Sequence, residues 1–120
     1  MTLPRIGITM GDPTGIGPEI IVKALSMKEP FQFCRPLVFG DREVLSKTIE
    51  MLGLTATVEV FEKIPEDGYL PQRIFLIPLS QLDADSLRFG KPDTKCGEAM
   101  VKYVEEAVSY THLTLPTNRE

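Results

Sequence analysis

The distribution of apolar and polar residues predicts strands and helices in alternation along the chain. Apolar runs predict strands at residues 5–10, 36–40 and 73–78. The run at residues 36–40 has no polar interruption, which is typical of a strand that is covered on both faces of a parallel sheet. Residues 57–61 alternate between polar and apolar, which predicts a further strand with one solvated side.

Two helices are predicted between these strands. The first begins at Pro18 and extends to about residue 27, where the Lys-Glu-Pro sequence that follows ends it. The second follows Asp41, whose carboxylate suits the N-cap position, and extends to Leu52. Gly53 then fits the left-handed conformation that often ends a helix.

A third helix is predicted from Asp93 or Thr94 to about residue 108, after a surface connection at residues 79–93. Five large or apolar side chains recur on one of its faces: Met100, Tyr103, Val104, Ala107 and Val108. We interpret this stripe as a core face rather than a cofactor contact. The order of strands and helices predicts an α/β fold with a mostly parallel sheet flanked by helices.

A glycine-rich stretch, GDPTGIGPE at residues 11–19, joins the first strand to the first helix. Glycines permit positive φ and close approach to the backbone, and a helix N-terminus offers free N–H groups to an anion. The glycine spacing differs from both the dinucleotide-binding fingerprint and the P-loop. The residues alone therefore leave two interpretations of this loop open. It is either a binding site for phosphate, pyrophosphate or carboxylate, or a tight connection between strand and helix with Asp12 as an ordinary turn residue.

The composition is typical of a small globular protein and argues against a nucleic-acid-binding, membrane-spanning or secreted one. The chain has 120 residues, of which 42% are hydrophobic and 25% charged, as expected for one small globular domain. A net charge of -4 without a basic run argues against nucleic acid as a partner. No apolar stretch is long enough to span a membrane, and the N-terminus does not resemble a secretory signal.

The two cysteines, Cys34 and Cys96, are far apart and form no C-x-x-C motif. We expect two reduced thiols in a cytoplasmic protein, with a disulfide or a metal pair as the alternative. The single histidine, His112, has no Cys, Asp or Glu at ligand spacing, so no metal ligand is assigned to it.

Residues 8–20, ITMGDPTGIGPEI, resemble the N-terminal signature of the 4-hydroxythreonine-4-phosphate dehydrogenase (PdxA) family. The isocitrate and isopropylmalate dehydrogenases, which are similar in fold, have a shorter loop without the Pro13-Thr14 pair. The resemblance continues through VFGD at 38–41, MLGL at 51–54 and GKP at 90–92, and covers about residues 3–108.

The resemblance implies a metal-dependent, NAD(P)-linked oxidation of 4-phosphooxy-L-threonine, with decarboxylation of the product, in pyridoxal 5'-phosphate biosynthesis. It also implies a homodimer. The close alternative is oxidation of threonate or erythronate 4-phosphate. The family's metal-binding histidines and its main cofactor contacts lie in later segments, so the sequence assigns no catalytic residue and no metal ligand.

The residues that remain as cofactor-binding candidates are in the glycine-rich stretch: Gly11, Asp12, Thr14, Gly15 and Gly17. Alternatively, Asp12 and Thr14 do not bind a cofactor and have only local roles, in which Asp12 caps a turn and Thr14 faces solvent.

The last twelve residues depart from the family pattern. The string SYTHLTLPT at 109–117 resembles translated sequencing-adapter DNA. We therefore expect residues 1–108 to be the N-terminal part of a PdxA-like dehydrogenase and residues 109–120 to be a non-native or disordered tail. A genuine edge strand is the alternative. Three functional hypotheses follow: an inactive fragment of an enzyme, an anion-binding module without catalysis, or a truncated domain without function.

Overall fold

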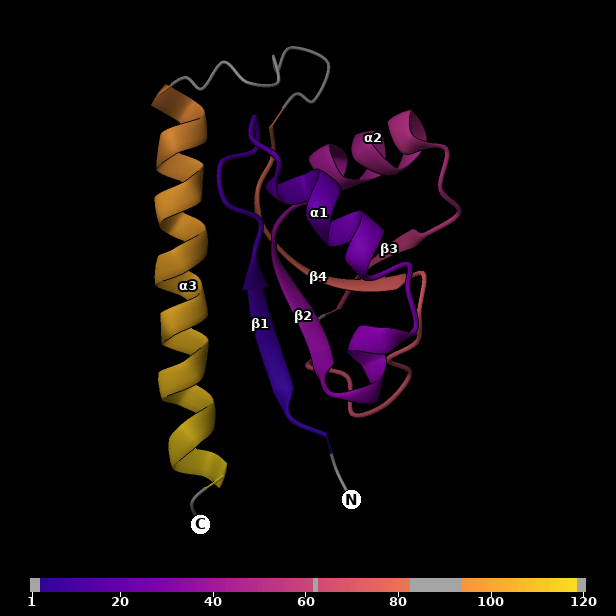
Figure 1. The fold of residues 1–120 in the computed structure, drawn as a ribbon. Coiled ribbons are helices and arrows are strands. Elements are labelled where there is room, and N and C mark those ends of the chain that lie inside the picture. The colour runs from indigo at the N-terminus through magenta and orange to yellow at the C-terminus, as the bar shows by residue number, and fades with distance from the viewer. Residues whose placement is uncertain (1–2, 62, 83–93, 119–120) are drawn as a thin grey trace.

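The computed structural model describes residues 3–61, 63–82 and 94–118, with side chains described through Val108. It contains four strands and three α-helices, with one short 3-10 helix (Figure 1). Their bounds along the chain are β1 (Arg5–Thr9), α1 (Gly17–Ala24), η1 (Glu29–Gln32), β2 (Arg35–Asp41), α2 (Arg42–Leu52), β3 (Thr57–Val60), β4 (Arg73–Ser80) and α3 (Thr94–Asn118).

The strands form one parallel sheet in the order β1-β2-β4-β3. The register places Ile8 beside Val38 and Val38 beside Leu76. This confirms the predicted α/β class and the parallel sheet. Because parallel strands end at the same edge, the residues that follow β1, β2 and β4 all lie together, and this carboxyl edge positions the candidate site.

The two central strands, β2 and β4, carry the core. From Pro36 to Asp41 every residue of β2 is buried, as are residues 74–77 of β4. Helix α1 packs against α2, and α3 contacts β1, β2 and β4. Figure 1 shows the sheet between α3 on one side and the pair α1 and α2 on the other.

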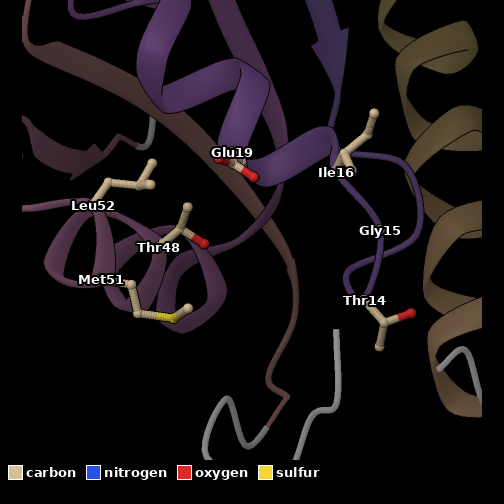
Figure 2. Close-up of a pocket in the computed structure, with 7 residues that line it drawn as sticks. All are labelled: Thr14, Gly15, Ile16, Glu19, Thr48, Met51 and Leu52. Atoms are coloured by element: carbon tan, nitrogen blue, oxygen red, sulfur yellow. The ribbon is translucent and has the colours of Figure 1, made fainter. Parts of the chain in front are cut away.

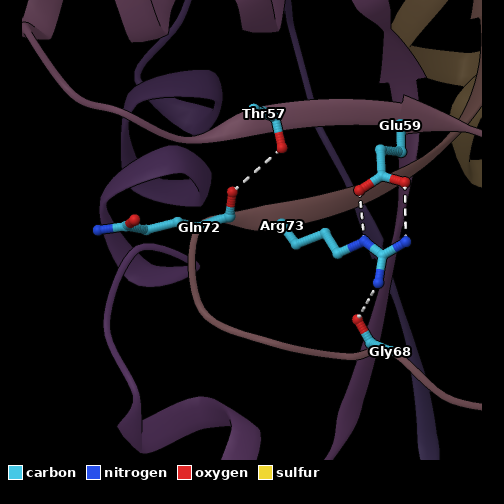
Figure 3. Close-up of polar contacts among 5 residues, drawn as sticks. All are labelled: Thr57, Glu59, Gly68, Gln72 and Arg73. Carbon is cyan, nitrogen blue, oxygen red and sulfur yellow. Dashed lines mark hydrogen bonds and ion pairs between the residues drawn. The ribbon is translucent and has the colours of Figure 1, made fainter.

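The edge strands are more exposed than the central ones. Ile6 in β1 is 45% exposed. Strand β3 has two half-buried central residues rather than one clearly solvated side. It is fixed to β4 by Arg73, which forms a two-point ion pair with Glu59 and donates to the carbonyl of Gly68 (Figure 3). The Thr57 hydroxyl also donates to the carbonyl of Gln72.

The second helix matches its prediction closely. Asp41 is its N-cap, and the Oδ1 atom accepts a hydrogen bond of 3.1 Å from the backbone N–H of Val44. Gly53 follows the helix with φ of +66°, the left-handed conformation expected there. The first helix ends at Ala24, earlier than predicted, because the N–H groups of Ser26 and Met27 bond to carbonyls three residues back, those of Lys23 and Ala24, instead of four.

The predicted buried face of the third helix is partly wrong. The residues that face the sheet are Cys96, Ala99 and Tyr103, whereas Met100 and Val104 are 38% and 48% exposed. Val108, also assigned to the buried face, is 50% exposed. The apolar surface of α3 is wider than the part that the sheet covers. The small side chains of Cys96 and Ala99 let that side of the helix pack closer to the sheet than the side with Met100 and Val104 could.

The third helix also extends past its predicted end near residue 108, through Asn118. Residues 109–115 contain neither glycine nor proline, so no residue with strong helix-ending chemistry stops it there. Of the connection predicted at residues 79–93, residues 83–93 lie outside the described residues, as do the last two residues of the chain. Leu79 and Ser80, which we assigned to that connection, are the last two residues of β4.

Cys34 is half-buried, Cys96 is buried, and no disulfide joins them. Burial raises the pKa of the Cys34 thiol. Within the described ranges, no helix has an apolar stretch that would suffice to cross a lipid bilayer.

Candidate functional site

The loop from Gly11 to Gly17 leaves β1 at the carboxyl edge of the sheet and opens α1. Two of its glycines are required by the backbone. Gly11 has φ of +74°, which few other residues adopt without strain. A Cβ atom at Gly17 would lie 2.1 Å from the carbonyl oxygen of Met10, so only glycine fits. Gly15 is also tight, because a Cβ atom added there would lie 3.3 Å from the carbonyl oxygen of Asp12.

Asp12 and Thr14 bond to each other. The Asp12 Oδ1 atom accepts from the backbone N–H of Thr14 at 2.8 Å and from its hydroxyl at 2.6 Å. The carbonyl of Asp12 accepts from Gly15 N at 2.9 Å, which closes the turn. The local role that we gave Asp12 is therefore present. The expectation that Thr14 faces solvent is wrong: Thr14 is 2% exposed because its hydroxyl turns inward to Asp12.

Helix α1 begins at this loop without a side-chain cap. The N–H groups of a first helical turn have no partner within the helix, and because Pro18 has none, this turn can offer a ligand those of Gly17 and Glu19. Glu19 lies in that turn and its negative charge opposes an anion, although Lys23 pairs with it at 2.9 Å on the exposed surface. Backbone N–H groups, rather than cationic side chains, are what this loop offers.

A pocket of about 330 Å³ lies between the loop and the second half of α2 (Figure 2). It is lined by Thr14, Gly15, Ile16, Glu19, Thr48, Met51 and Leu52. Ile16 and Met51 are largely exposed, at 70% and 59%, and the Thr48 hydroxyl donates to the carbonyl of Val44. The pocket therefore has mostly apolar walls, with one carboxylate at the start of α1.

A buried polar cluster at the same edge escaped the sequence analysis. The Asp41 Oδ2 atom accepts from Ser80 Oγ and from the backbone N–H of Leu82, both at 2.7 Å. Ser80 Oγ lies 2.6 Å from the hydroxyl of Tyr103. Asp41 and Tyr103 are both fully buried. Burial raises the pKa of Tyr103 to about 12, and the nearby carboxylate of Asp41 adds to the rise.

A second, larger pocket of about 650 Å³ lies beside this cluster, at the ends of β2 and β4. It is lined by Asp41, Arg42, Glu43, Val60, Pro78, Ser80, Gln81 and Leu82. From the sequence, the only role predicted for the side chain of Asp41 is that of a helix cap. The signal that was available is positional: polar residues that end two neighbouring buried parallel strands meet at the ligand-binding edge of the sheet.

In the part of the chain that the structure describes, no three His, Cys, Asp or Glu side chains come together as a metal site. The side chain of His112 lies outside that part.

Comparison with known proteins identifies the family. The chain is 42% identical over 105 residues to a protein of Desulforapulum autotrophicum named 4-hydroxythreonine-4-phosphate dehydrogenase, covering 88% of this chain and 31% of that protein. A crystal structure with the same enzyme name, from Burkholderia phymatum, matches with a TM-score of 0.87 at 33% identity, covering 95% of this chain and 34% of that one. The chain belongs to the PdxA family. The family and fold that the sequence signature predicted are thereby confirmed.

Relatives of this PdxA-family chain carry more than one enzyme name. A Clostridium botulinum protein provisionally named D-threonate 4-phosphate dehydrogenase is 32% identical over 124 residues, covering 98% of this chain and 37% of that protein. The chain thus spans about a third of the length of the relatives it matches. No protein-family model matches the chain.

Proposed function

We propose that the chain forms the N-terminal part of an NAD(P)-dependent dehydrogenase that oxidises 4-phosphooxy-L-threonine in pyridoxal 5'-phosphate biosynthesis. The observation that carries the proposal is the strand–loop–helix unit from Gly11 to Glu19, in which Gly11 and Gly17 are required by the backbone geometry. It lies at the carboxyl edge of the sheet, where open α/β folds bind their ligands.

In this proposal the loop contributes to cofactor binding through Gly11, Asp12, Thr14, Gly15 and Gly17. The glycines keep the backbone accessible. Asp12 and Thr14 fix the shape of the turn through their mutual hydrogen bonds. NAD(P)+ would accept the hydride that the substrate loses. No described residue is assigned a catalytic role.

The family resemblance also implies a divalent metal ion, which as a Lewis acid would polarise the substrate hydroxyl. The described residues do not fit this group, because they bring no three suitable ligands together. We therefore expect its ligands in the part of the relatives that this chain does not span. A homodimer is expected for the full-length protein on the same grounds.

A second candidate is oxidation of threonate or erythronate 4-phosphate. The observation that favours it is that several relatives at 32% to 36% identity bear the D-threonate 4-phosphate dehydrogenase name. All these substrates are phosphorylated hydroxy acids, so the same loop and cofactor would serve each of them.

We also propose that residues 1–108 belong to the dehydrogenase and that residues 109–120 are a non-native tail. Sequencing of the source locus from independent DNA tests this. A reading frame that diverges from the present sequence after Val108 supports the proposal. A frame that encodes residues 109–120 as given contradicts it.

The enzymatic proposal is tested by kcat/KM of the full-length protein for the three phosphorylated acids, with NAD+ and with NADP+ and a divalent metal. Preference for 4-phosphooxy-L-threonine supports the first candidate. Preference for threonate or erythronate 4-phosphate supports the second candidate and contradicts the first. The absence of turnover with all three contradicts both.

A further inference from the structure

The cluster of Asp41, Ser80 and Tyr103 connects β2, α2, β4 and α3 by hydrogen bonds around the carboxylate of Asp41. Asp41 ends β2 and accepts from Val44 N in α2, from the Ser80 hydroxyl at the end of β4, and from Leu82 N just beyond it. Ser80 continues the chain of hydrogen bonds to Tyr103 in α3. A helix cap requires only the first of these contacts, so capping does not explain the others.

The direction of these hydrogen bonds follows from the number of protons. Asp41 receives only donors, and Ser80 has a single hydroxyl proton, which it gives to Asp41. Ser80 Oγ can then only accept at its contact with Tyr103, so the Tyr103 hydroxyl is the donor. The result is a directed chain from Tyr103 through Ser80 to Asp41, in which each hydroxyl has one defined orientation.

This cluster lies next to the glycine-rich loop through Met10. Met10 is fully buried, and its N–H donates to the carbonyl of Phe39 at 3.0 Å. Gly40, adjacent to Asp41, leaves so little room that an added Cβ would lie 2.9 Å from the Met10 Cβ. On the other side, Gly17 packs directly on the Met10 carbonyl. Met10 therefore fills the space between the end of β2 and the start of α1.

We propose that Asp41, Ser80 and Tyr103 are positioning residues that hold the Gly11–Gly17 loop in a single place at the carboxyl edge. The network fixes the end of β2, the end of β2 fixes Met10, and Met10 fixes the two ends of the loop. None of the three residues needs to touch a ligand. Their effect on the loop does not depend on the proposed enzyme activity, but its consequence for cofactor affinity rests on the proposed function.

Amide hydrogen exchange of the 120-residue chain tests the effect on the loop. Tyr103→Phe removes only the donor at the end of the network. The matched control is Tyr69→Phe, which removes a hydroxyl that donates to the carbonyl of Pro65 at the same distance, 2.6 Å, but before β4, at the opposite edge of the sheet. The loss of one partly buried hydrogen bond predicts about fivefold faster exchange at residues 10–17 in Tyr103→Phe alone.

Equal exchange at residues 10–17 in Tyr103→Phe and the unmodified chain overturns the proposal. So does an equal increase in both tyrosine variants, because that would reflect a general loss of stability. If Tyr103→Phe does not fold, Ser80→Ala and Ser80→Thr replace it. Faster loop exchange in the alanine variant, restored by threonine, supports the network, and no difference between the two overturns it.

The consequence for affinity is measured on the full-length protein as the Kd for NADH and NADPH. Tyr103→Phe is expected to raise the Kd about fivefold, because the loop is then held in its binding position about fivefold less often. Tyr69→Phe is expected to leave the Kd unchanged. Absence of cofactor binding by the unmodified protein contradicts the proposed function, while the exchange result still decides the positioning of the loop. Binding that is unchanged in Tyr103→Phe contradicts the role of the network in affinity.

Discussion

The hydroxyl of Tyr103 lies 2.6 Å from Oγ of Ser80, which joins the middle of α3 to the end of β4. Tyr103 is fully buried at this contact. A phenol in this environment loses its proton reluctantly, because the phenolate would be desolvated and would face the carboxylate of Asp41.

The raised pKa of Tyr103 predicts a loss of stability in strong alkali. The folded state keeps the proton up to about pH 12, whereas the unfolded chain releases it near the ordinary tyrosine value of 10.0. The contribution of Tyr103 to the free energy of unfolding is therefore fully present below the ordinary tyrosine pKa. It is lost as the pH rises through the pKa of the folded state. Ultraviolet titration of tyrosinate should show one group near pH 12 that is missing from Tyr103→Phe. An unchanged titration curve in that variant would contradict the assignment.

The contact between Gly17 and Met10 predicts an intolerant position. Gly17→Ala would place a methyl group against the Met10 carbonyl oxygen, and we expect a loss of about 2–3 kcal/mol or more in the free energy of unfolding. Gly97→Ala is the matched control, because an added Cβ there has no neighbour within 4 Å. It should stabilise α3 by about 0.5–1 kcal/mol. Chemical denaturation measures both, and equal effects of the two substitutions would refute this packing.

Asp41 is expected to be the most sensitive polar position of the described chain. Asp41→Ala removes the cap of α2 and leaves the partly buried donors of Ser80 and Leu82 without their acceptor. We expect a loss of about 3 kcal/mol or more in the free energy of unfolding. Asp41→Asn keeps a side-chain oxygen that can cap the helix, so its loss should be smaller. Equal losses in the two variants, measured by urea denaturation, would show that the hydrogen bonds are not the cause.

The ion pair between Arg73 and Glu59 predicts a small dependence of stability on acid. The hydrogen bond from Arg73 lowers the pKa of Glu59. The pair therefore stabilises the fold above the ordinary glutamate pKa, and this contribution is lost as the pH falls through the lowered value.

Glu59→Gln should consequently lower Tm slightly at neutral pH and not at all in strong acid. The effect is small because both side chains are partly exposed, at 39% and 40%, and salt should reduce it further. Thermal unfolding at several pH values measures the difference. A difference in Tm that persists in acid would contradict the ion-pair explanation.

Local sequence chemistry was sufficient for much of the fold. The α2 helix was predicted at both ends, because Asp41 and Gly53 act through their immediate backbone neighbours. The parallel sheet followed from the uninterrupted apolar run at residues 36–40 and the alternation of strands with helices. For α2 the decisive interactions lie within a few residues of Asp41 and Gly53. For the sheet, the apolar run indicated only that the strand is covered on both faces, and the pairing itself joins distant residues.

Features that depend on distant segments were missed. The face of α3 that packs on the sheet is chosen by the fit of Cys96 and Ala99, and helical periodicity does not distinguish it from the neighbouring apolar face. Thr14 is an exception, because the contact that turns its hydroxyl inward is local, to Asp12 two residues earlier, and was nevertheless missed. The contact of Asp41 with Ser80 joins residues that are 39 positions apart, and only the strand order brings them together.

The central proposal is that this chain of the PdxA family contributes to a dehydrogenase whose chemistry also needs residues in the part of the relatives that it does not span. The most direct measurement compares the formation of reduced nicotinamide by the full-length protein and by the 120-residue chain. Both would receive the same phosphorylated hydroxy acids, NAD(P)+ and divalent metal. We predict turnover by the full-length protein and none by the 120-residue chain. Metal-dependent turnover by the 120-residue chain, or none by the full-length protein, would contradict the account.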